Sequence, residues 1–160
     1  MSIAAQILEL SIEKGIMIAC AESCTGGMLA ASLTDLPGSS VMFERGFVTY
    51  TNAAKMDMLD VRDTTLQEFG AVSEQVAHEM AAGALAGSAA QIALSITGIA
   101  GPGGSEHKPE GRVCFGIATA RGILTQTQEF GALGRAAVRC AARDHALEMI
   151  LASLHNLPGD

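Results

Sequence analysis

The sequence predicts an α/β fold: a single-domain layered sandwich in which helices flank a mixed sheet of about five strands. Segments with helical periodicity alternate along the chain with short apolar or β-branched runs, and this alternation is typical of α/β proteins. Two strand-like runs in the last third are separated only by a tight turn, so one hairpin makes the sheet mixed. With 160 residues, 49% of them hydrophobic and 17% charged, the chain has enough apolar material for one folded core.

Six segments are expected to form helices, because apolar residues recur in them at spacings of three and four and capping residues stand at their ends. The expected helices span residues 2–14, 28–33, 53–59, 63–69, 73–85 and 134–155. Gly15 and Gly70 follow two of these segments, where glycine commonly ends a helix. Ser73 is suited to begin the fifth, and Thr51 or Asn52 to cap the third.

Five short runs are expected to form strands, since they are apolar, β-branched or aromatic. They span residues 16–18, 46–50, 92–96, 112–120 and 123–130. Residues 121–122 form a tight turn between the last two, which should pair as a hairpin. A glycine-rich loop, residues 97–105, follows the third strand. Its free N–H groups form either a cradle for an anion or carbonyl oxygen, or a plain connection.

A cluster of polar and small residues lies where the first strand ends and the second helix begins. Ser23 and Thr25 stand on this turn, and Gly26 and Gly27 follow them and allow a ligand to approach the backbone. Ligands of open α/β sheets bind at this edge, and the N–H groups of a first helical turn carry partial positive charge. Ser23 is therefore a candidate nucleophile with nearby oxyanion donors. The alternative is that Ser23 or Thr25 merely caps the helix.

A serine nucleophile needs a base, and Lys55 is better placed for this role than the four histidines. Tyr50 ends the second expected strand and Lys55 lies in the first turn of the next helix. Both side chains can therefore point into one cleft at the edge that holds Ser23. For Lys55 to be half neutral near pH 7 its pKa must fall by ~3, which burial or a neighbouring cation can supply. The alternatives are a solvated lysine and a tyrosine that packs in the core.

Three arginines, Arg135, Arg139 and Arg143, recur every four residues along one face of the last expected helix. Arg135 lies near the N-terminus of this helix, where a phosphate would gain both the helix dipole and a bidentate partner. The alternative is a solvated charged face, because Asp144 and Glu148 are close in the sequence.

The charge and the cysteine content exclude several classes of protein. The net charge is −7, so we expect neither a nucleic-acid nor a membrane-surface partner, both of which require a basic face. No run of about 18 apolar residues is present and the first residues lack the basic region of a signal peptide, so a cytoplasmic protein is expected. The four cysteines have no zinc-type spacing, so we expect free thiols, no metal and no cofactor.

Four motifs stand in order along the chain. They are residues 21–27 (AESCTGG), 43–50 (FERGFVTY) with Asn52 and Lys55, 70–73 (GAVS), and 95–102 (SITGIAGP) followed by Lys108 and Pro109. Together they closely resemble the CinA C-terminal domain family, which includes stand-alone nicotinamide-nucleotide amidases. The resemblance runs over nearly the whole chain and implies a single CinA C-terminal-like amidase domain over residues 1–160.

The resemblance implies hydrolysis of nicotinamide mononucleotide, a small-molecule substrate, to nicotinate mononucleotide and ammonia. It implies a serine nucleophile with lysine and tyrosine assistance, no cofactor, and a homodimer. The expected catalytic residues are Ser23, Tyr50 and Lys55. The expected substrate-binding residues are Thr25, Gly26, Gly27, Thr97, Gly98, Arg135 and Arg139.

Two other functions stay open at this point. One is a catalytically silent pyridine-nucleotide-binding or regulatory module, against which the intact set of Ser23, Tyr50 and Lys55 argues. The other is a Ser–Lys hydrolase of a different amide, whose activity would not need a phosphate on the substrate. Cys24, next to Ser23, is the rival nucleophile.

Overall fold

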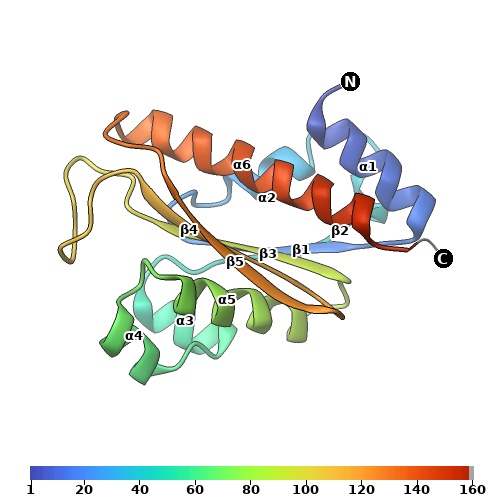
Figure 1. Cartoon of the computed structure of the whole chain (residues 1–160). Coiled ribbons are helices and arrows are strands. Elements are labelled where there is room, and N and C mark those ends of the chain that lie inside the picture. The colour runs from blue at the N-terminus through green and yellow to red at the C-terminus, as the bar shows by residue number, and fades with distance from the viewer. Residues whose placement is uncertain (159–160) are drawn as a thin grey trace.

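The computed structural model describes residues 1–158, in which a central sheet lies between two groups of helices (Figure 1). On one face lie α1 (Ile3–Lys14), α2 (Met28–Leu33) and α6 (Arg135–Asn156). On the other face lie α3 (Asn52–Leu59), α4 (Asp63–Phe69) and α5 (Glu74–Ala86). The strands are β1 (Ile18–Glu22), β2 (Phe43–Val48), β3 (Ile92–Gly98), β4 (Arg112–Thr119) and β5 (Gly122–Glu129), and a short 3₁₀ turn, η1 (Ser39–Val41), precedes β2.

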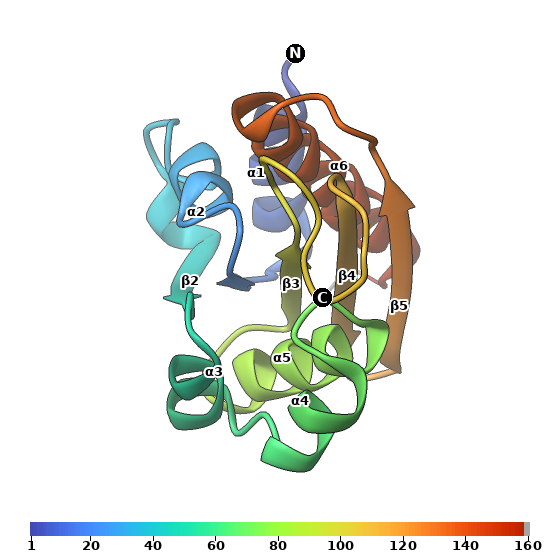
Figure 2. The ribbon, with the colours of Figure 1, turned by 90° about the vertical axis from the view of Figure 1, so that its left-hand side faces the viewer.

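The five strands form one mixed sheet in the order β2-β1-β3-β4-β5. β1 pairs in parallel with both β2 and β3, whereas β4 pairs antiparallel with β3 and with β5. The predicted mixed sheet and its hairpin are therefore confirmed. Figure 2 faces the edge where the three parallel strands end, and the loop after β3 (yellow) and the start of α6 lie at this same edge.

Residues of β1 alternate between the two faces of the sheet, as a period of two requires. Ile18 and Cys20 join the core that includes residues of α1, α2 and α6. Ala19 and Ala21 join the core on the α5 side. Because these alanines are small, the α5 layer can lie close to the strand that leads to Ser23.

The first two strands differ in their bounds from the sequence prediction. β1 runs from Ile18 to Glu22 and not over residues 16–18, since the small residues that follow Ile18 fit between two neighbouring strands. β2 begins at Phe43 and ends at Val48, whereas residues 46–50 were expected. Tyr50 consequently lies beyond the strand, in the connection to α3.

The prediction for the third strand was too short, and the hairpin turn lies one residue earlier than expected. β3 continues to Gly98, because Thr97 pairs with Cys114 and Gly98 with Val113 of β4. Thr97 and Gly98 therefore belong to the sheet and not to the glycine-rich loop. Gly122 already pairs with Thr119, so residues 120–121 make the turn.

The helix predictions are confirmed to within a residue or two at each end, and the expected capping residues cap. Ser73 Oγ accepts the N–H of Val76 over 3.2 Å at the start of α5. Thr51 Oγ1 accepts the N–H of Ala54 over 3.1 Å and fixes the start of α3, the helix that carries Lys55. Within residues 1–158, none of the helices combines the length and the apolar character needed to cross a membrane.

Candidate active site

The segment that begins with the last residue of β1, residues 22–27 (the Ser23 turn), holds Ser23 at the carboxyl edge of the sheet. The N–H of Ser23 donates to the carbonyl of Ile96 over 3.0 Å, which extends the pairing of β1 with β3 by one residue. Gly26 and Gly27 then reverse the chain with φ values of 55° and 106°, in the left-handed region that favours glycine. Ser23 is 8% exposed, so its hydroxyl is reached only through the cleft described below.

A buried carboxylate, and not Ser23 or Thr25, caps α2. The two oxygens of Glu22 accept the N–H groups of Leu29 over 2.9 Å and Ala30 over 3.0 Å. The hydroxyl of Thr25 donates to Glu22 Oε1 over 2.6 Å. The alternative in which Ser23 or Thr25 caps the helix is therefore wrong. Since Glu22 occupies these two N–H groups, they are not available to an oxyanion.

Lys55 reaches Ser23 from α3, the helix that follows β2. Its Nζ lies 3.1 Å from Ser23 Oγ and donates to the carbonyl of Thr49 over 2.9 Å and that of Tyr50 over 3.4 Å. The side chain is 1% exposed, which is exceptional for a lysine. The structure thus brings Ser23 and Lys55 together, as the sequence predicts.

The surroundings of Lys55 favour its neutral amine. Burial is the largest influence and lowers the pKa of Lys55, whereas interactions with Cys24 and Glu106 raise it to a lesser extent. Among residues 1–158, no carboxylate forms an ion pair with Lys55. A buried lysine with a lowered pKa beside a serine hydroxyl has the chemistry of a base beside a nucleophile.

Tyr50 and Arg135 meet at the rim, away from the Ser23 hydroxyl. Arg135 donates from Nη2 to the hydroxyl of Tyr50 over 2.8 Å and from Nη1 to the carbonyl of Gly101 over 2.7 Å. The Tyr50 side chain is 57% exposed, and only its backbone carbonyl contacts Lys55. Tyr50 therefore lies in the candidate site, but its hydroxyl points to the arginine.

A cavity of about 200 Å³ opens beside Ser23 and Lys55. Its other lining residues are Cys24, Tyr50, Asn52, Ala71, Val72, Thr97, Gly98, Ala100 and Arg135. A second hollow of about 280 Å³ lies under the glycine-rich loop. Five residues line both hollows: Ala71, Val72, Gly98, Ala100 and Arg135. The two hollows together form one cleft, which we call the Ser23 cleft.

Thr97 and Gly98 shape the wall of the Ser23 cleft. The hydroxyl of Thr97 donates to the carbonyl of Ala71 over 2.8 Å and so fixes the α4–α5 connection at the cleft. Its single proton is engaged in this contact. A Cβ at position 98 would lie 2.7 Å from Val113 Cγ2 and 3.0 Å from Cys24 Sγ, so a larger residue there would not fit.

Four predicted substrate-binding residues, Thr25, Gly26, Gly27 and Arg139, are not among the described residues that line the Ser23 cleft. The first three belong to the Ser23 turn itself. Arg139 lies behind this turn: Nε donates to the carbonyl of Cys24 over 3.0 Å and Nη2 to that of Thr25 over 3.4 Å.

The sequence reasoning assigned no role in the site to Glu22 or Asn52. Asn52 lines the cleft at the start of α3 and was noted only as a candidate helix cap and as part of a motif. Glu22 carries its signal in the sequence as an acidic residue directly before a polar turn and a helix, where a carboxylate can accept helix N–H groups. This signal predicts a cap at the N-terminus of α2, but it does not predict that the carboxylate of Glu22 is buried.

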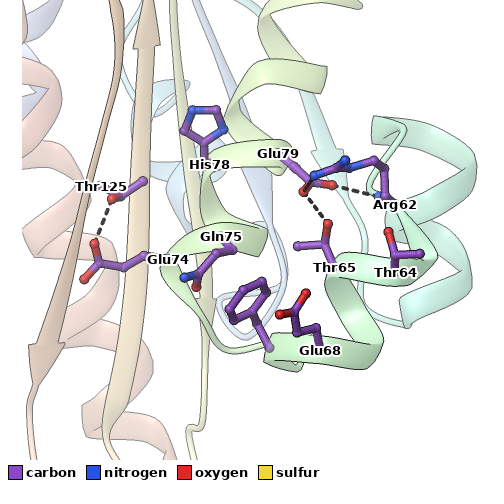
Figure 3. A pocket seen from close by; sticks show the side chains of 10 residues that line it. Arg62, Thr64, Thr65, Glu68, Glu74, Gln75, His78, Glu79 and Thr125 are labelled. Carbon is purple, nitrogen blue, oxygen red and sulfur yellow. Dashed lines mark hydrogen bonds and ion pairs between the residues drawn. The ribbon is translucent and has the colours of Figure 1, made fainter.

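A larger hollow of about 480 Å³ lies between α4, α5 and β5 (Figure 3). Three of its charged side chains are engaged within the hollow: Glu79 contacts Arg62 and Thr65, and Glu74 accepts from Thr125. The described residues that line it include no serine, cysteine or lysine. It therefore has no counterpart of the Ser23–Lys55 pair.

The fold and the cleft define an α/β protein with a polar site at the carboxyl edge of parallel strands, the position at which such sheets bind ligands. The family model of the CinA C-terminal domain matches residues 1–154. This chain belongs to the CinA C-terminal domain family, and the family predicted from the motifs is confirmed.

Relatives of known name and structure match over nearly the full length. The chain is 51% identical over 152 residues to the nicotinamide-nucleotide amidohydrolase PncC of Enterobacter agglomerans, covering 89% of this chain and 92% of that protein. It is 50% identical over 151 residues to the protein of the same name from Escherichia coli strain K12, covering 94% of this chain and 92% of that protein. The crystal structure of the competence/damage inducible protein CihA from Agrobacterium tumefaciens superposes with a TM-score of 0.91 at 48% identity, over 96% of this chain and 93% of that one.

Proposed function

We propose that this chain is a nicotinamide-nucleotide amidase, which hydrolyses nicotinamide mononucleotide to nicotinate mononucleotide and ammonia with Ser23 as nucleophile. The names of two relatives at 51% and 50% identity support the reaction. The observation that carries the mechanism is the 3.1 Å separation of Ser23 Oγ from the Nζ of a buried Lys55.

The proposed reaction has two halves. Neutral Lys55 accepts the hydroxyl proton of Ser23, whose Oγ attacks the amide carbon. The C–N bond then breaks, Lys55 gives its proton to the departing nitrogen, and ammonia leaves. A water molecule that Lys55 deprotonates attacks the acyl-enzyme, which releases nicotinate mononucleotide and restores Ser23. The proton passes directly between Ser23 and Lys55, because the Tyr50 hydroxyl contacts Arg135.

The oxyanion of the tetrahedral intermediate needs donors that are free. We assign this role to the N–H of Cys24, the residue after the nucleophile. Within residues 1–158, this N–H donates to no backbone carbonyl. Protonated Lys55 adds positive charge at the same moment. Thr97 is a weaker candidate, since its hydroxyl already donates to Ala71.

The phosphate of the substrate is assigned to the rim of the Ser23 cleft. Arg135 is exposed and is the first residue of α6, so a phosphate there would meet both a guanidinium group and a helix N-terminus. Its partner Tyr50 would assist at the same place. This assignment predicts that the mononucleotide is preferred over the riboside.

Cys24 is disfavoured as the nucleophile. Burial is the largest influence on its thiol and raises the pKa to about 11, although Arg139 and Lys55 oppose this. The thiolate is the reactive form, so little of it is present at neutral pH.

The test is ammonia release from nicotinamide mononucleotide by the wild type, Ser23→Ala and Cys24→Ser. We expect release by the wild type and by Cys24→Ser, and a loss of at least ~10³-fold for Ser23→Ala. Full activity of Ser23→Ala would reject Ser23 as the nucleophile. If the wild type releases nothing but binds the nucleotide in a titration, the chain is the silent binding module. Equal rates with the riboside would instead indicate a hydrolase of another amide.

Two further proposals extend the expectations of the sequence analysis. We propose a cytoplasmic location and a homodimeric assembly, of which sedimentation equilibrium tests the second.

A further inference from the structure

Glu22 is a fully buried carboxylate that directly precedes the proposed nucleophile. It is 0% exposed and is held by two backbone N–H groups and the hydroxyl of Thr25, at 2.6 to 3.0 Å. No arginine, lysine or histidine forms an ion pair with it in the described part of the chain. The carboxyl group is thus held by hydrogen bonds at the N-terminal end of α2. These contacts tie the first residue of the Ser23 turn to the helix that follows it.

Arg139 binds carbonyl groups of the same turn. Its guanidinium group donates to the carbonyls of Cys24 and Thr25, the two residues after Ser23. A Cβ at position 26 would lie 3.3 Å from Arg139 Nη2, so the turn and the guanidinium group are in close contact. A carboxylate therefore binds two N–H groups in the first turn of α2, and a cation binds two carbonyls of the Ser23 turn.

Beyond Ser23, whose N–H pairs with Ile96 of β3, the turn has no regular secondary structure to fix it. Residues 24–27 form turns, two of them glycines with positive φ, between the end of β1 and a helix of six residues. A displacement of about 1 Å at a reacting atom can cost ~10²-fold in rate. The separation of 3.1 Å between Ser23 Oγ and Lys55 Nζ thus depends on what immobilises this turn.

We propose that Glu22 and Arg139 are positioning residues that together hold Ser23 at its distance from Lys55, and that Arg139 does not bind the phosphate of the substrate. The inference rests on the proposed function, in which Ser23 is the nucleophile. It replaces the role expected for Arg139 from the family resemblance. We assign selectivity for the phosphate to Arg135, which lines the Ser23 cleft.

The decisive measurement compares kcat, KM and the preference for the mononucleotide over the riboside. Glu22→Gln and Arg139→Met should each lower kcat by about 10- to 100-fold. The preference, taken as the ratio of the two kcat/KM values, should stay unchanged in both. Arg135→Met should instead raise KM for the mononucleotide and lower the preference. Arg139→Lys keeps the charge but not the planar fork, so it should also lower kcat without changing the preference.

The chain offers a matched control for each variant. Glu79 caps α4 as Glu22 caps α2, since it accepts the N–H of Arg62 over 2.8 Å and the hydroxyl of Thr65 over 2.5 Å (Figure 3). Glu79→Gln should lower stability to urea but leave kcat unchanged. Arg143 lies one turn after Arg139 on α6 and pairs with Asp144 over 2.9 Å. Arg143→Met should leave both kcat and the preference unchanged.

Two kinetic results would overturn the proposal: a fall in the preference for the mononucleotide in Arg139→Met, or an unchanged kcat in Glu22→Gln. The rate at which a fluorophosphonate probe labels Ser23, read by intact mass, separates this proposal from the proposed function. If the wild type releases no ammonia but is labelled faster than Glu22→Gln and Arg139→Met, the positioning role stands and the substrate assignment fails. Equal labelling of all three would overturn the positioning role whatever the substrate.

Discussion

At the scale of single residues, the activity should follow the ionisation of Lys55. Burial lowers the pKa of its amine, so the neutral form is reached below the ordinary value of about 10.4. We expect kcat/KM to rise with pH through a limb whose midpoint is the lowered pKa of Lys55 in the free enzyme. The pH dependence of kcat/KM for ammonia release checks this.

Lys55→Arg provides the control for the pH profile, because a guanidinium group keeps its proton throughout the accessible range. The variant should lose activity and the rising limb together. A rising limb that persists in Lys55→Arg would show that another group is the base.

The lowered pKa of Lys55 also affects stability, because the unfolded chain binds this proton more tightly than the folded protein does. The free energy of unfolding should therefore rise as pH increases from the folded pKa towards about 10.4.

The residues of the site differ in how far the sequence could predict them. Ser23 and Lys55 could be placed together because each lies next to the carboxyl end of a parallel strand, and such ends meet at one edge. The direction of the Tyr50 side chain could not be predicted, since it depends on where β2 stops and on Arg135, 85 residues further along the chain. Glu22 was missed because a charged residue is ordinarily exposed, and its burial depends on contacts with α2 that only the fold creates.

At the scale of elements, the helices were predictable and the strand ends were not. Helix ends carry local signals, such as the Ser73 cap and the left-handed Gly15, which act within a few residues. Strand ends depend on partners far along the chain. Thr97 was assigned to a loop because Gly98 and Gly101 follow it. In the structure, its pairing with Cys114 of β4 keeps it in the sheet.

The packing of α3 on α5 should be critical, because α3 carries Lys55. The two helices meet at Gly83, where a Cβ would overlap the backbone carbonyl of Leu59 at the end of α3. Gly83→Ala must therefore push α3 outward, at a cost of about 1–3 kcal/mol in the free energy of unfolding. The shift should also move Lys55 away from Ser23 and lower kcat. Urea unfolding and ammonia release measure the two effects.

The control for Gly83→Ala separates a moved helix from a general loss of stability. Glu79→Gln removes a helix cap outside the Ser23 cleft and should lower stability without lowering kcat. If Gly83→Ala were as stable and as active as the wild type, the contact between α3 and α5 would not determine the position of Lys55.

At the scale of the whole molecule, the candidate site exists only when the complete sheet is assembled. Ser23 follows β1, Lys55 follows β2, Thr97 is the last residue but one of β3, and Arg135 begins the last helix. These four residues come from different elements and meet at the same edge of the sheet. Each contact between them therefore joins two elements. The stability of the layers is therefore a condition for activity. We expect the packing of α6 on the sheet to be the part that responds to pH.

His145 makes that packing sensitive to acid. It lies on α6 with its Nε2 2.8 Å from Gln126 Oε1 of β5, and its ring contacts Phe115 of β4 with the centroids 4.7 Å apart. Burial is the larger influence and lowers the pKa of His145, whereas Glu148 raises it. The folded protein consequently binds this proton less tightly than the unfolded chain, in which the pKa is about 6.5.

The free energy of unfolding should therefore be highest above about pH 6.5 and should fall as the pH drops towards the lowered pKa of His145. His145→Leu removes the titrating group, while Gln126 Oε1 keeps a donor in Gln128 at 2.9 Å. The variant should show a smaller loss of stability between pH 7.5 and pH 5 than the wild type in urea unfolding. His78→Gln, which removes an exposed histidine on α5, should follow the wild type. If His145→Leu lost as much stability as the wild type over this range, protonation of His145 would not be what loosens α6 from the sheet.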